Sequence, residues 1–599
     1  MRVLGGLGLA LLVAAASAPV SASVTWTVGA GADCDAHTIQ DAVNLAAQSQ
    51  TTEAKFIEIA SDQDYSAQSI HVANQSLGFV GGPLFCDSLF TGDPTVISGD
   101  GASGPVFSIT GASSIDFYHL EIRDGTANDG GGIDFVGNGS LALTDVLLDF
   151  NNATNGGAIS ASTSGGTIDI FLNEETLILR NTAQASGGGI ALAGETYLYA
   201  VKNDTLIGYN RAVSGYGGGI FALTPGQVTI GSPGYHGLPV LFDNNAVNGG
   251  GIAMISGGGD DNGNVRLFTT DASTPVSISG NIASSYGGAI YLRSEEDLAA
   301  QTAQLCAQDV DFNDNAAVQG TALALDTGSG SIVDSGSFAD INPDGSCDNE
   351  GLGAVHCSVT GTCNQMSRNI AQDSNGQPTD GATVLIGTSS TLNLRRMEMH
   401  GNTGGYFILA IGDNDSGFGL FPRTRLLNCL TGANAFNHEL IRIEGDDNDI
   451  GITQCTFAPD IINSTHVIHF DNSGGNSLVL AESVVDEPGT LTLSSPGIAL
   501  TAQNILTNDA STLPSAPDIV QGEPAYVDLA NGNYRLAPTS PGVDFSAAGG
   551  GTDLDGHPRD VDLPQTPNFL GPRDLGAYET QRTFACSVAD TIYCNGFEN

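Results

Sequence analysis

The stretch SGGGIALAGETYLYAVKNDTLIGYNRAVSGYGGGIFAL, residues 186–223, contains two copies of a phrase that recurs along the chain. The phrase is Gly-Gly-Gly-Ile or Gly-Gly-Ala-Ile, and its copies are 26 to 38 residues apart. They end at Ile133, Ile159, Ile190, Ile220, Ile252 and Ile290. An asparagine precedes most copies, at Asn152, Asn181, Asn210, Asn245 and Asn281, and Asn315 with residues 320–325 forms a degenerate seventh copy. A regular internal repeat of this length indicates a solenoid or a propeller.

Each repeat consists of short apolar runs that alternate with small or polar residues and are separated by Gly, Asn, Asp and Ser. This pattern predicts strands and turns. None of the repeats has apolar residues at the 3.6-residue spacing of a helix over a sufficient length. One unit cannot bury an apolar face alone, so successive units must stack. A propeller needs longer units with an aromatic signature, whereas this chain is 7% aromatic with one Trp. We therefore predict an all-β fold, a single-stranded right-handed parallel β-helix in which asparagines stack on asparagines.

The repeat resembles that of the polymorphic outer-membrane proteins, which combine an F-x-x-N phrase with a G-G-A-[ILV] phrase. Residues 242–245 and 312–315 give the first phrase, and the Gly-Gly-Ile series gives the second. The resemblance covers about a third of the chain and implies the fold rather than an activity. The opening T-I-Q-D-A-V, residues 38–43, followed by I-E-I, is similar to the start of pectin-lyase-like β-helix proteins.

The composition is acidic, with 66 Asp and Glu against 18 Lys and Arg and a net charge of −48. Such a surface repels nucleic acid and anionic membranes, so we exclude both as main partners. Residues 1–22 have the pattern of a secretory signal peptide: Arg2, an apolar run, and a small-residue site at 20–22. No other run is long enough to predict a transmembrane helix. We therefore expect an extracellular or outer-surface location.

Changes in composition and in the spacing of the repeats divide the sequence beyond the signal peptide into segments. A short amphipathic helix after Thr38 is expected to cap the open end of the β-helix. Near the C-terminus, the phrases at 534–536, 540–541, 553–559 and 574–579 resemble the choice-of-anchor Q domain of bacterial β-helix proteins. The expected segments are an N-terminal cap with first coils at 23–104, Gly-rich repeats at 105–326, a loop insertion at 327–381, further coils at 382–513, the anchor-like domain at 514–579 and a Cys-containing tail at 580–599.

Ten cysteines in an exported chain favour disulfides. We expect Cys34 to bond to Cys86, Cys429 to Cys455, which lie at equivalent points of successive coils, and Cys586 to Cys594. The pairing of Cys306, Cys347, Cys357 and Cys363 cannot be deduced from sequence. In the anchor-like domain, Asp553, Asp555, Arg559 and Asp574 are expected to pair with one another and fix a structural cap.

Three oxygen-rich turns offer the ligands that calcium prefers: Asp260-Asp261-Asn262-x-Asn264, Asp413-Asn414-Asp415 and Asp446-Asp447-Asn448-Asp449. We take Asp446, Asp447 and Asp449 as the candidate metal ligands, with calcium as the candidate cofactor. The phrase Gly445-Asp446-Asp447 is faintly similar to polygalacturonases, but the N-T-D, G-H-G and R-I-K phrases of that family are missing. The sequence therefore assigns no catalytic residue.

We interpret the chain as an exported, non-enzymatic surface rod for adhesion or for binding polysaccharides or surface proteins. The alternative is a calcium-assisted polysaccharide lyase or hydrolase of the pectin-lyase-like class. A groove where carboxylates and an Arg converge on one strand face would favour the enzyme, and a smooth rod would favour binding. Ligand identity, oligomeric state and the mode of surface attachment stay open.

Overall fold

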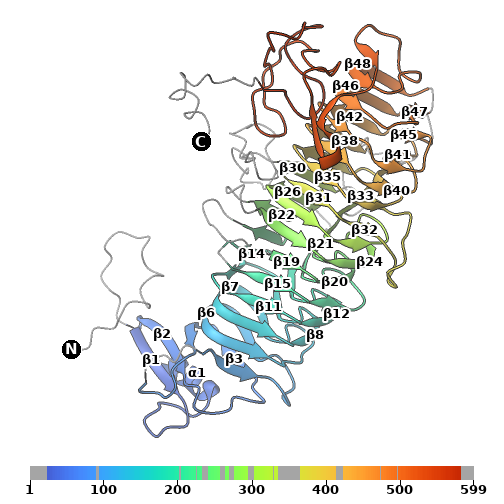
Figure 1. Cartoon of the computed structure of the whole chain (residues 1–599). Helices are drawn as coiled ribbons and strands as arrows, with labels where there is room; N and C mark the ends of the chain where they lie inside the picture. Colours follow the sequence, from blue (N-terminus) through green and yellow to red (C-terminus); the bar gives the residue numbers. More distant parts are fainter. Residues whose placement is uncertain are drawn as a thin grey trace, which may run out of the picture.

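The chain forms an elongated stack of parallel strands (Figure 1). The computed structural model describes residues 23–88, 93–201, 204–223, 225–231, 240–255, 263–268, 275–294, 303–327, 329–334, 364–412, 422–471, 474–494 and 497–581. The expected signal peptide and the tail with Cys586 and Cys594 lie outside these ranges. One 39-stranded sheet wraps around the stack and a 10-stranded sheet closes it. The prediction of an all-β parallel β-helix with a short N-terminal helix is confirmed.

Each full coil presents four faces, which we call A, B, C and D in chain order. The first coils pair β1 (Ser23–Val28), β2 (Ala54–Ile59), β3 (Ile70–Ala73), β4 (Ser76–Val80) and β5 (Thr95–Ser98) with the long strands β6 (Phe107–Arg123) and β7 (Ile133–Asp149), which pass over faces A, B and C. Face A continues through β9 (Ile159–Ser162), β13 (Ile190–Ala193), β17 (Ile220–Leu223), β21 (Ile252–Ile255), β25 (Ile290–Arg293), β29 (Leu323–Asp326), β33 (Ala382–Ile386), β37 (Tyr406–Ile411), β41 (Ile441–Glu444), β45 (His466–Phe470) and β47 (Leu491–Ser494). Face B continues through β10 (Ile168–Leu172), β14 (Thr196–Ala200), β18 (Gln227–Ile230), β22 (Gly263–Phe268), β26 (Ala303–Gln308), β30 (Gly330–Asp334), β34 (Thr391–Arg395), β38 (Arg423–Leu427) and β42 (Asp449–Thr453).

Face C is built from β11 (Leu177–Leu179), β15 (Leu206–Gly208), β19 (Val240–Phe242), β23 (Val276–Ser279), β27 (Val310–Asn313), β31 (Gln365–Ser367), β35 (Glu398–His400), β39 (Leu430–Gly432) and β43 (Thr456–Phe457). The last coils, β46 (Ser477–Val485), β48 (Ala499–Thr507) and β49 (Ile519–Gln521), complete faces B and C. Face D is the ten-stranded sheet of β8 (Asn152–Asn155), β12 (Thr182–Ser186), β16 (Arg211–Ala212), β20 (Asn245–Asn248), β24 (Ile282–Tyr286), β28 (Ala316–Ala317), β32 (Ile370–Ala371), β36 (Thr403–Gly404), β40 (Ala435–Phe436) and β44 (Ile461–Ile462).

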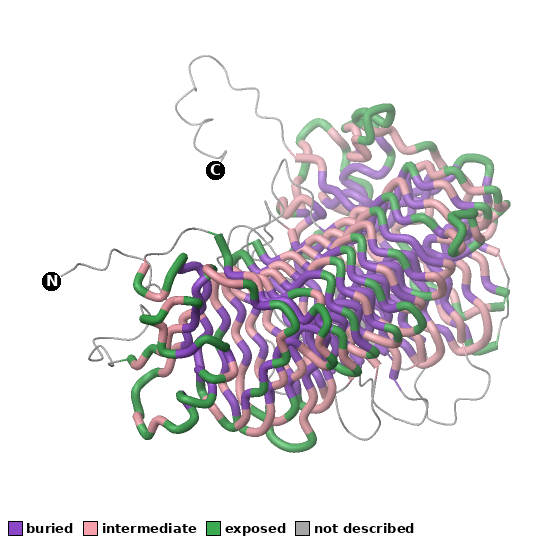
Figure 2. The backbone as a smooth tube through the Cα atoms, turned by 90° about the horizontal axis from the view of Figure 1, so that it is seen from below, coloured by how far each residue is buried: buried purple, intermediate pink, exposed green. Residues whose placement is uncertain are grey.

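The repeated isoleucines lie one above another on the inner side of face A. Ile133 pairs with Ile159, and the register continues through Ile190, Ile220, Ile252 and Ile290. Each of these side chains is fully buried. They belong to one hydrophobic core that runs from Val28 to Leu513, and Figure 2 shows its buried residues along the inside of the rod. Burial of apolar surface is the main favourable contribution to such a fold.

The paired glycines make the corner between faces D and A. In the copy before Ile190, Gly187 has φ +69°, a conformation that L side chains rarely adopt. A Cβ on the next residue, Gly188, would lie 2.3 Å from the carbonyl oxygen of Gly218 in the following coil. The first glycine is therefore required by backbone conformation and the second by the close approach of two coils.

A ladder of buried asparagines fixes the corner between faces C and D. Each Nδ2 donates to Oδ1 of the next member at 2.9 to 3.2 Å. The members are Asn151, Asn181, Asn210, Asn244, Asn281, Asn315, Asn369, Asn402 and Asn434. The predicted stacking is thus confirmed, but two members were assigned one residue too late, because Asn152 is exposed and Asn245 lies on β20. The ladder member directly follows a residue with positive φ, here Phe150 and Asp243.

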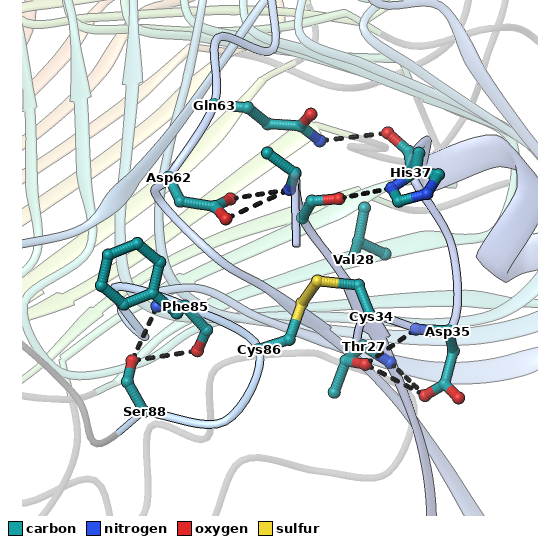
Figure 3. The surroundings of a disulfide bond; sticks show 12 residues. Thr27, Val28, Cys34, Asp35, His37, Asp62, Gln63, Phe85, Cys86 and Ser88 are labelled. Atoms are coloured by element: carbon teal, nitrogen blue, oxygen red, sulfur yellow. Dashed lines mark hydrogen bonds between the residues drawn. A yellow bond between two sulfur atoms is a disulfide. The ribbon is translucent and has the colours of Figure 1, made fainter. Parts of the chain in front are cut away.

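The N-terminal end is closed by a cap, and Figure 3 shows the disulfide between Cys34 and Cys86 within it. Helix α1 (Ile39–Gln48) begins after Thr38, whose Oγ1 accepts a hydrogen bond from Asp41 N–H at 3.1 Å. Its buried side chains, on one helical face, are Ile39, Ala42, Val43 and Ala46. The disulfide Cys34–Cys86 joins the segment before the helix to an early coil, as expected.

Two expectations about the middle of the chain need correction. The range 327–381 is not loop throughout, because strands β30, β31 and β32 fall within it and continue faces B, C and D. Cys429 and Cys455 are buried free thiols rather than a disulfide. Cys429 N–H instead donates to Cys455 Sγ at 3.4 Å, and Cys429 Sγ donates to the Leu394 carbonyl oxygen at 3.4 Å, so both sulfurs form hydrogen bonds at a coil corner. Cys306 is disulfide-bonded, and its candidate partners lie outside the described ranges.

The residues that follow β49 form a C-terminal segment, defined here as 522–581, which packs against face C of the last coils. It contains the antiparallel pair β50 (Tyr526–Asp528) and β51 (Asn533–Leu536), with the 3₁₀ turn η2 (Leu529–Asn531) between them. One apolar contact joins Val484 and Leu506 of the coils to Val543, Phe545 and Leu575.

Polar contacts complete the docking of the C-terminal segment. Buried Arg559 donates to Asn428 Oδ1 at 2.7 Å, Arg573 donates to Glu482 Oε2 at 3.1 Å, and Ala577 N–H donates to Thr456 Oγ1 at 2.9 Å. The segment is therefore attached along the side of the rod.

Candidate functional site

The predicted metal ligands lie at the corner between faces A and B. Asp449 starts β42 and pairs with Arg425, and its other oxygen accepts from Ser477 Oγ at 3.0 Å. The pKa of Asp449 lies below its ordinary value, because the hydrogen bonds from Arg425 and Ser477 outweigh its partial burial. The carboxyl groups of Asp446 and Asp447 lie against Gly474 and Gly475 of the next coil.

The structure therefore does not gather these three carboxylates into one cluster with the spacing of metal ligands. In the part of the chain that the structure describes, such a cluster of three is found at Asp553, Asp555 and His557. Calcium binding at Asp446, Asp447 and Asp449 stays a prediction.

The Asp553 cluster is explained by the fold of the C-terminal segment. Asp553 is fully buried, and its two oxygens accept from the backbone N–H groups of His557 at 2.7 Å and Glu579 at 3.0 Å. Asp555 forms an ion pair with Arg535. Of the expected contacts among Asp553, Asp555, Arg559 and Asp574, Arg559 donates to the backbone carbonyl oxygen of Asp574 at 3.4 Å. The carboxylates of Asp553 and Asp555 are instead held by backbone N–H groups and by Arg535, which fixes the turn.

Carboxylates and an arginine converge on the outer side of face A at Arg442. Its guanidinium donates to Glu439 at 2.8 Å, to Glu444 at 3.1 Å and to Asp471. It also lies 5.8 Å from the centre of the Tyr406 ring. Hydrogen bonding and these negative charges outweigh its partial burial and raise the pKa of Arg442, so the side chain stays protonated and cannot act as a general base.

A Ser-His-Asp chain lies beside Arg442. His469 Nε2 is 2.8 Å from Asp471 Oδ1, and His469 Nδ1 bonds to Ser494 Oγ. The order resembles a nucleophile, base and orienting acid. However, Arg442, His469 and Ser494 are neighbours in the parallel register of β41, β45 and β47, so outward side chains meet there as part of the strand ladder. Asp471 is also already paired with Arg442.

Face B presents an aromatic patch on its outer side, which we define as Phe171, Tyr197 and Tyr199. The rings of Phe171 and Tyr199 stack with centres 5.2 Å apart and planes 13° apart. All three side chains are half-buried. The register places small residues at the two ends of the stack, Ala142 beside Phe171 and Thr229 beside Tyr199.

Acidic and hydroxyl groups surround this aromatic patch. Asp169 pairs in register with Tyr197 on the neighbouring strand. Burial, Glu195 and Asp169 raise the pKa of Tyr197, and burial and Asp169 raise that of Tyr199, so both phenols keep their proton as hydrogen-bond donors. Aromatic rings with nearby polar groups are typical of surfaces that bind sugars or proteins.

The aromatic patch was not among the sites predicted from the sequence. The two segments IDIFL (168–172) and TYLYA (196–200) alternate inward aliphatic and outward aromatic or acidic residues. That period-two pattern could have identified outward rings. Their contact could not be predicted, since it depends on which strands are neighbours.

The parts of the chain with described coordinates contain no helix long and apolar enough to cross a membrane. Residues 275–293 match the Chlamydia polymorphic membrane protein (Chlamydia_PMP) repeat. They comprise β23, the ladder residue Asn281, β24 and the Gly-Gly corner before Ile290 on β25. A search of curated proteins finds no match. The match connects the chain with bacterial surface or outer-membrane-associated proteins, and the chain is a parallel β-helix that contains a repeat similar to that of the polymorphic membrane proteins.

Proposed function

We propose that the protein is an exported surface rod that binds an extended ligand, a glycan or a neighbouring surface protein, and so serves adhesion rather than catalysis. Export rests on the signal-peptide pattern of residues 1–22, and attachment on the resemblance of residues 514–579 to an anchor-like domain. Both are proposals that secretion and fractionation of the intact protein would test. The aromatic patch on face B is the observation that supports binding.

Charge narrows the class of ligand. A net charge of −48 repels polyuronates such as pectin and alginate, and Asp169 adds a negative charge at the aromatic patch itself. Rings that contact C–H groups, together with phenol and carboxylate groups that bond hydroxyls, fit a neutral, hydroxyl-rich glycan better. We therefore expect neutral glycans to bind and polyuronates not to bind.

The test is a glycan-binding assay with the double variant Tyr197→Ala and Tyr199→Ala. Both side chains point outward, so the variant should keep its thermal unfolding temperature. Tyr209→Ala is the matched control, because Tyr209 is 54% exposed and lies outside the patch. Neutral-glycan or protein binding should fall in the double variant and persist in the control. Equal binding by wild type and double variant would refute a role for face B.

A second candidate function is polysaccharide lysis or hydrolysis, which the convergence of Glu439, Glu444 and Asp471 on Arg442 favours. Hydrolysis is considered because glycoside hydrolysis requires a pair of carboxyl groups. Two observations count against this function: all three carboxylates are paired with one arginine, and the negative charge of the protein repels uronates. Incubation with pectin, alginate and neutral polysaccharides, with and without calcium, decides the matter. Sugar release that is lost in Arg442→Ala and Ser494→Ala would replace the binding proposal.

A further inference from the structure

The asparagine ladder continues beyond Asn434 into two carboxylic acids, Asp460 and Glu487. Asn434 donates to Asp460 Oδ1 from its backbone N–H at 2.7 Å and from Nδ2 at 3.1 Å. Asp460 N–H donates in turn to Glu487 Oε2 at 3.0 Å. These are the bonds that every earlier member makes. The register therefore places the second oxygen of Asp460 where each asparagine has its donating Nδ2.

This exchange of an amide for an acid leaves an acceptor without a donor. Asp460 Oδ2 and Glu487 Oε1 are both buried, and Glu487 Oε1 has no hydrogen-bond partner. Hydrogen bonds from Asn434 and from the Thr431 hydroxyl favour the ionised form of Asp460. Glu487 is only 1% exposed. An ionised carboxyl has no proton to donate, so two charged groups here would face each other unpaired. A proton on either acid restores the donor that the ladder otherwise provides.

The groups around the pair supply no compensating positive charge. Asp486 lies on the same turn, and Tyr526 and Tyr534 face the pair from the C-terminal segment. Among the described residues, no ion pair joins Asp460, Asp486 or Glu487 to a Lys, Arg or His. The Tyr526 hydroxyl faces Asp486 and hydrogen-bonds its carboxyl group, and Asp486 adds a further negative charge beside Glu487.

The pair also lies beneath the docked C-terminal segment. The Tyr534 ring lies so close to β39 that a Cβ on Gly432 would be 2.6 Å from its Cζ. Tyr526 and Tyr534 pack against a cluster that joins Leu430 and Ala458 of the coils to Leu554, Ala577 and Tyr578. A charge that appears on the pair is therefore buried under the aromatic contact that holds the segment to the rod.

We propose that Asp460 and Glu487 form a carboxyl–carboxylate pair that holds one shared proton, and that this proton makes docking of the C-terminal segment dependent on pH. The pair is independent of what face B binds. Burial raises the pKa of Asp460 to about 6, and burial together with the charge of Asp460 raises the pKa of Glu487 to about 9.

The direction of the pH effect follows from these shifts. A carboxyl with a raised pKa binds more protons in the docked state than in the undocked state. Its contribution to docking is complete below its ordinary pKa of 4.5 and is lost as the pH rises toward about 9. Within that window, one coupled proton changes the docking equilibrium by up to about tenfold per pH unit.

Hydrogen exchange of the full chain measures docking directly, through the protection of residues 540–580 at about pH 5, 7 and 9 after correction for intrinsic exchange rates. The variants are Asp460→Asn, which extends the amide ladder by one member, and the double variant Asp460→Asn with Glu487→Gln. Asp100→Asn is the control, since it removes one exposed acid far from the pair. Glu398 and Glu579 also have raised pKa values, and they contribute equally in all four proteins.

In wild type and in Asp100→Asn, protection should fall as the pH rises. In the double variant the slope should be shallower by about one proton, with more protection at about pH 9. The same slope in the double variant as in wild type would overturn the proposal. Restoration of wild-type protection at about pH 9 by calcium would overturn it too, because a cation and not a proton would then neutralise the pair.

Discussion

Replacement of Asn151 by alanine tests the asparagine ladder most directly. Asn151 is 1% exposed and makes three side-chain hydrogen bonds. It accepts from Gly125 N–H at 3.0 Å and donates to Ile122 O at 3.0 Å and to Asn181 Oδ1 at 3.1 Å. At a net value of about 1 kcal/mol per buried bond, Asn151→Ala should lower the free energy of unfolding by about 3 kcal/mol.

The neighbouring residue provides a matched control. Asn152 has the same side chain but is exposed on β8, so Asn152→Ala should change stability by no more than about 0.5 kcal/mol. A solenoid need not unfold in one step, so urea unfolding should be combined with hydrogen exchange of the Gly125 amide. Equal destabilisation by the two variants, or continued protection of Gly125 in Asn151→Ala, would refute the ladder as the element that fixes this corner.

Three further predictions concern the corners and the cysteines. Gly188→Ala should destabilise the chain by about 3 kcal/mol, because its Cβ would strike the next coil's backbone, whereas Gly165→Ala, with nothing within 4 Å of the added atom, should be neutral in thermal unfolding. Reduction of the disulfide Cys34–Cys86, which spans 52 residues, should cost about 4 kcal/mol and loosen the cap first, as reported by fluorescence of the single Trp. The thiols Cys429 and Cys455 should react with an alkylating reagent only after denaturation, and mass spectrometry that finds them bonded would contradict the structure.

The fold was predictable because its strongest signals are local. Every Gly-Gly-Ile phrase contains the glycines that the corner requires and, directly after them, an isoleucine whose side chain points into the core. The ladder was harder to place where two asparagines adjoin, at 151–152 and 244–245. The structure selects the one after the residue with positive φ, which is Phe150 in one case and Asp243 in the other. Asp is one of the side chains that favour this conformation, but Phe is not, so local sequence does not identify the corner at 150.

The candidate sites were less predictable, since each depends on strands that are distant in sequence. Asp449 was taken as a metal ligand because its turn is acidic, yet its partner Arg425 comes from the coil before. Likewise, the C-terminal phrases indicated a separate unit, but nothing local showed that Arg559 would reach Asn428 on the rod. Such contacts follow from the register of the coils, which periodicity alone does not give.

The two-residue spacing at the asparagine corner constrains how this rod can vary in length. Gly208 and Arg211, Phe242 and Asn245, and Asn313 and Ala316 flank that corner with the same gap. Between faces B and C the gaps differ widely, as from Ala200 to Leu206, from Ile230 to Val240 and from Asp334 to Gln365. Insertions are therefore tolerated next to the face that carries the half-buried aromatic patch, while the asparagine corner must stay uniform. Relatives of this protein could diversify their recognition loops on one side without disturbing the scaffold on the other.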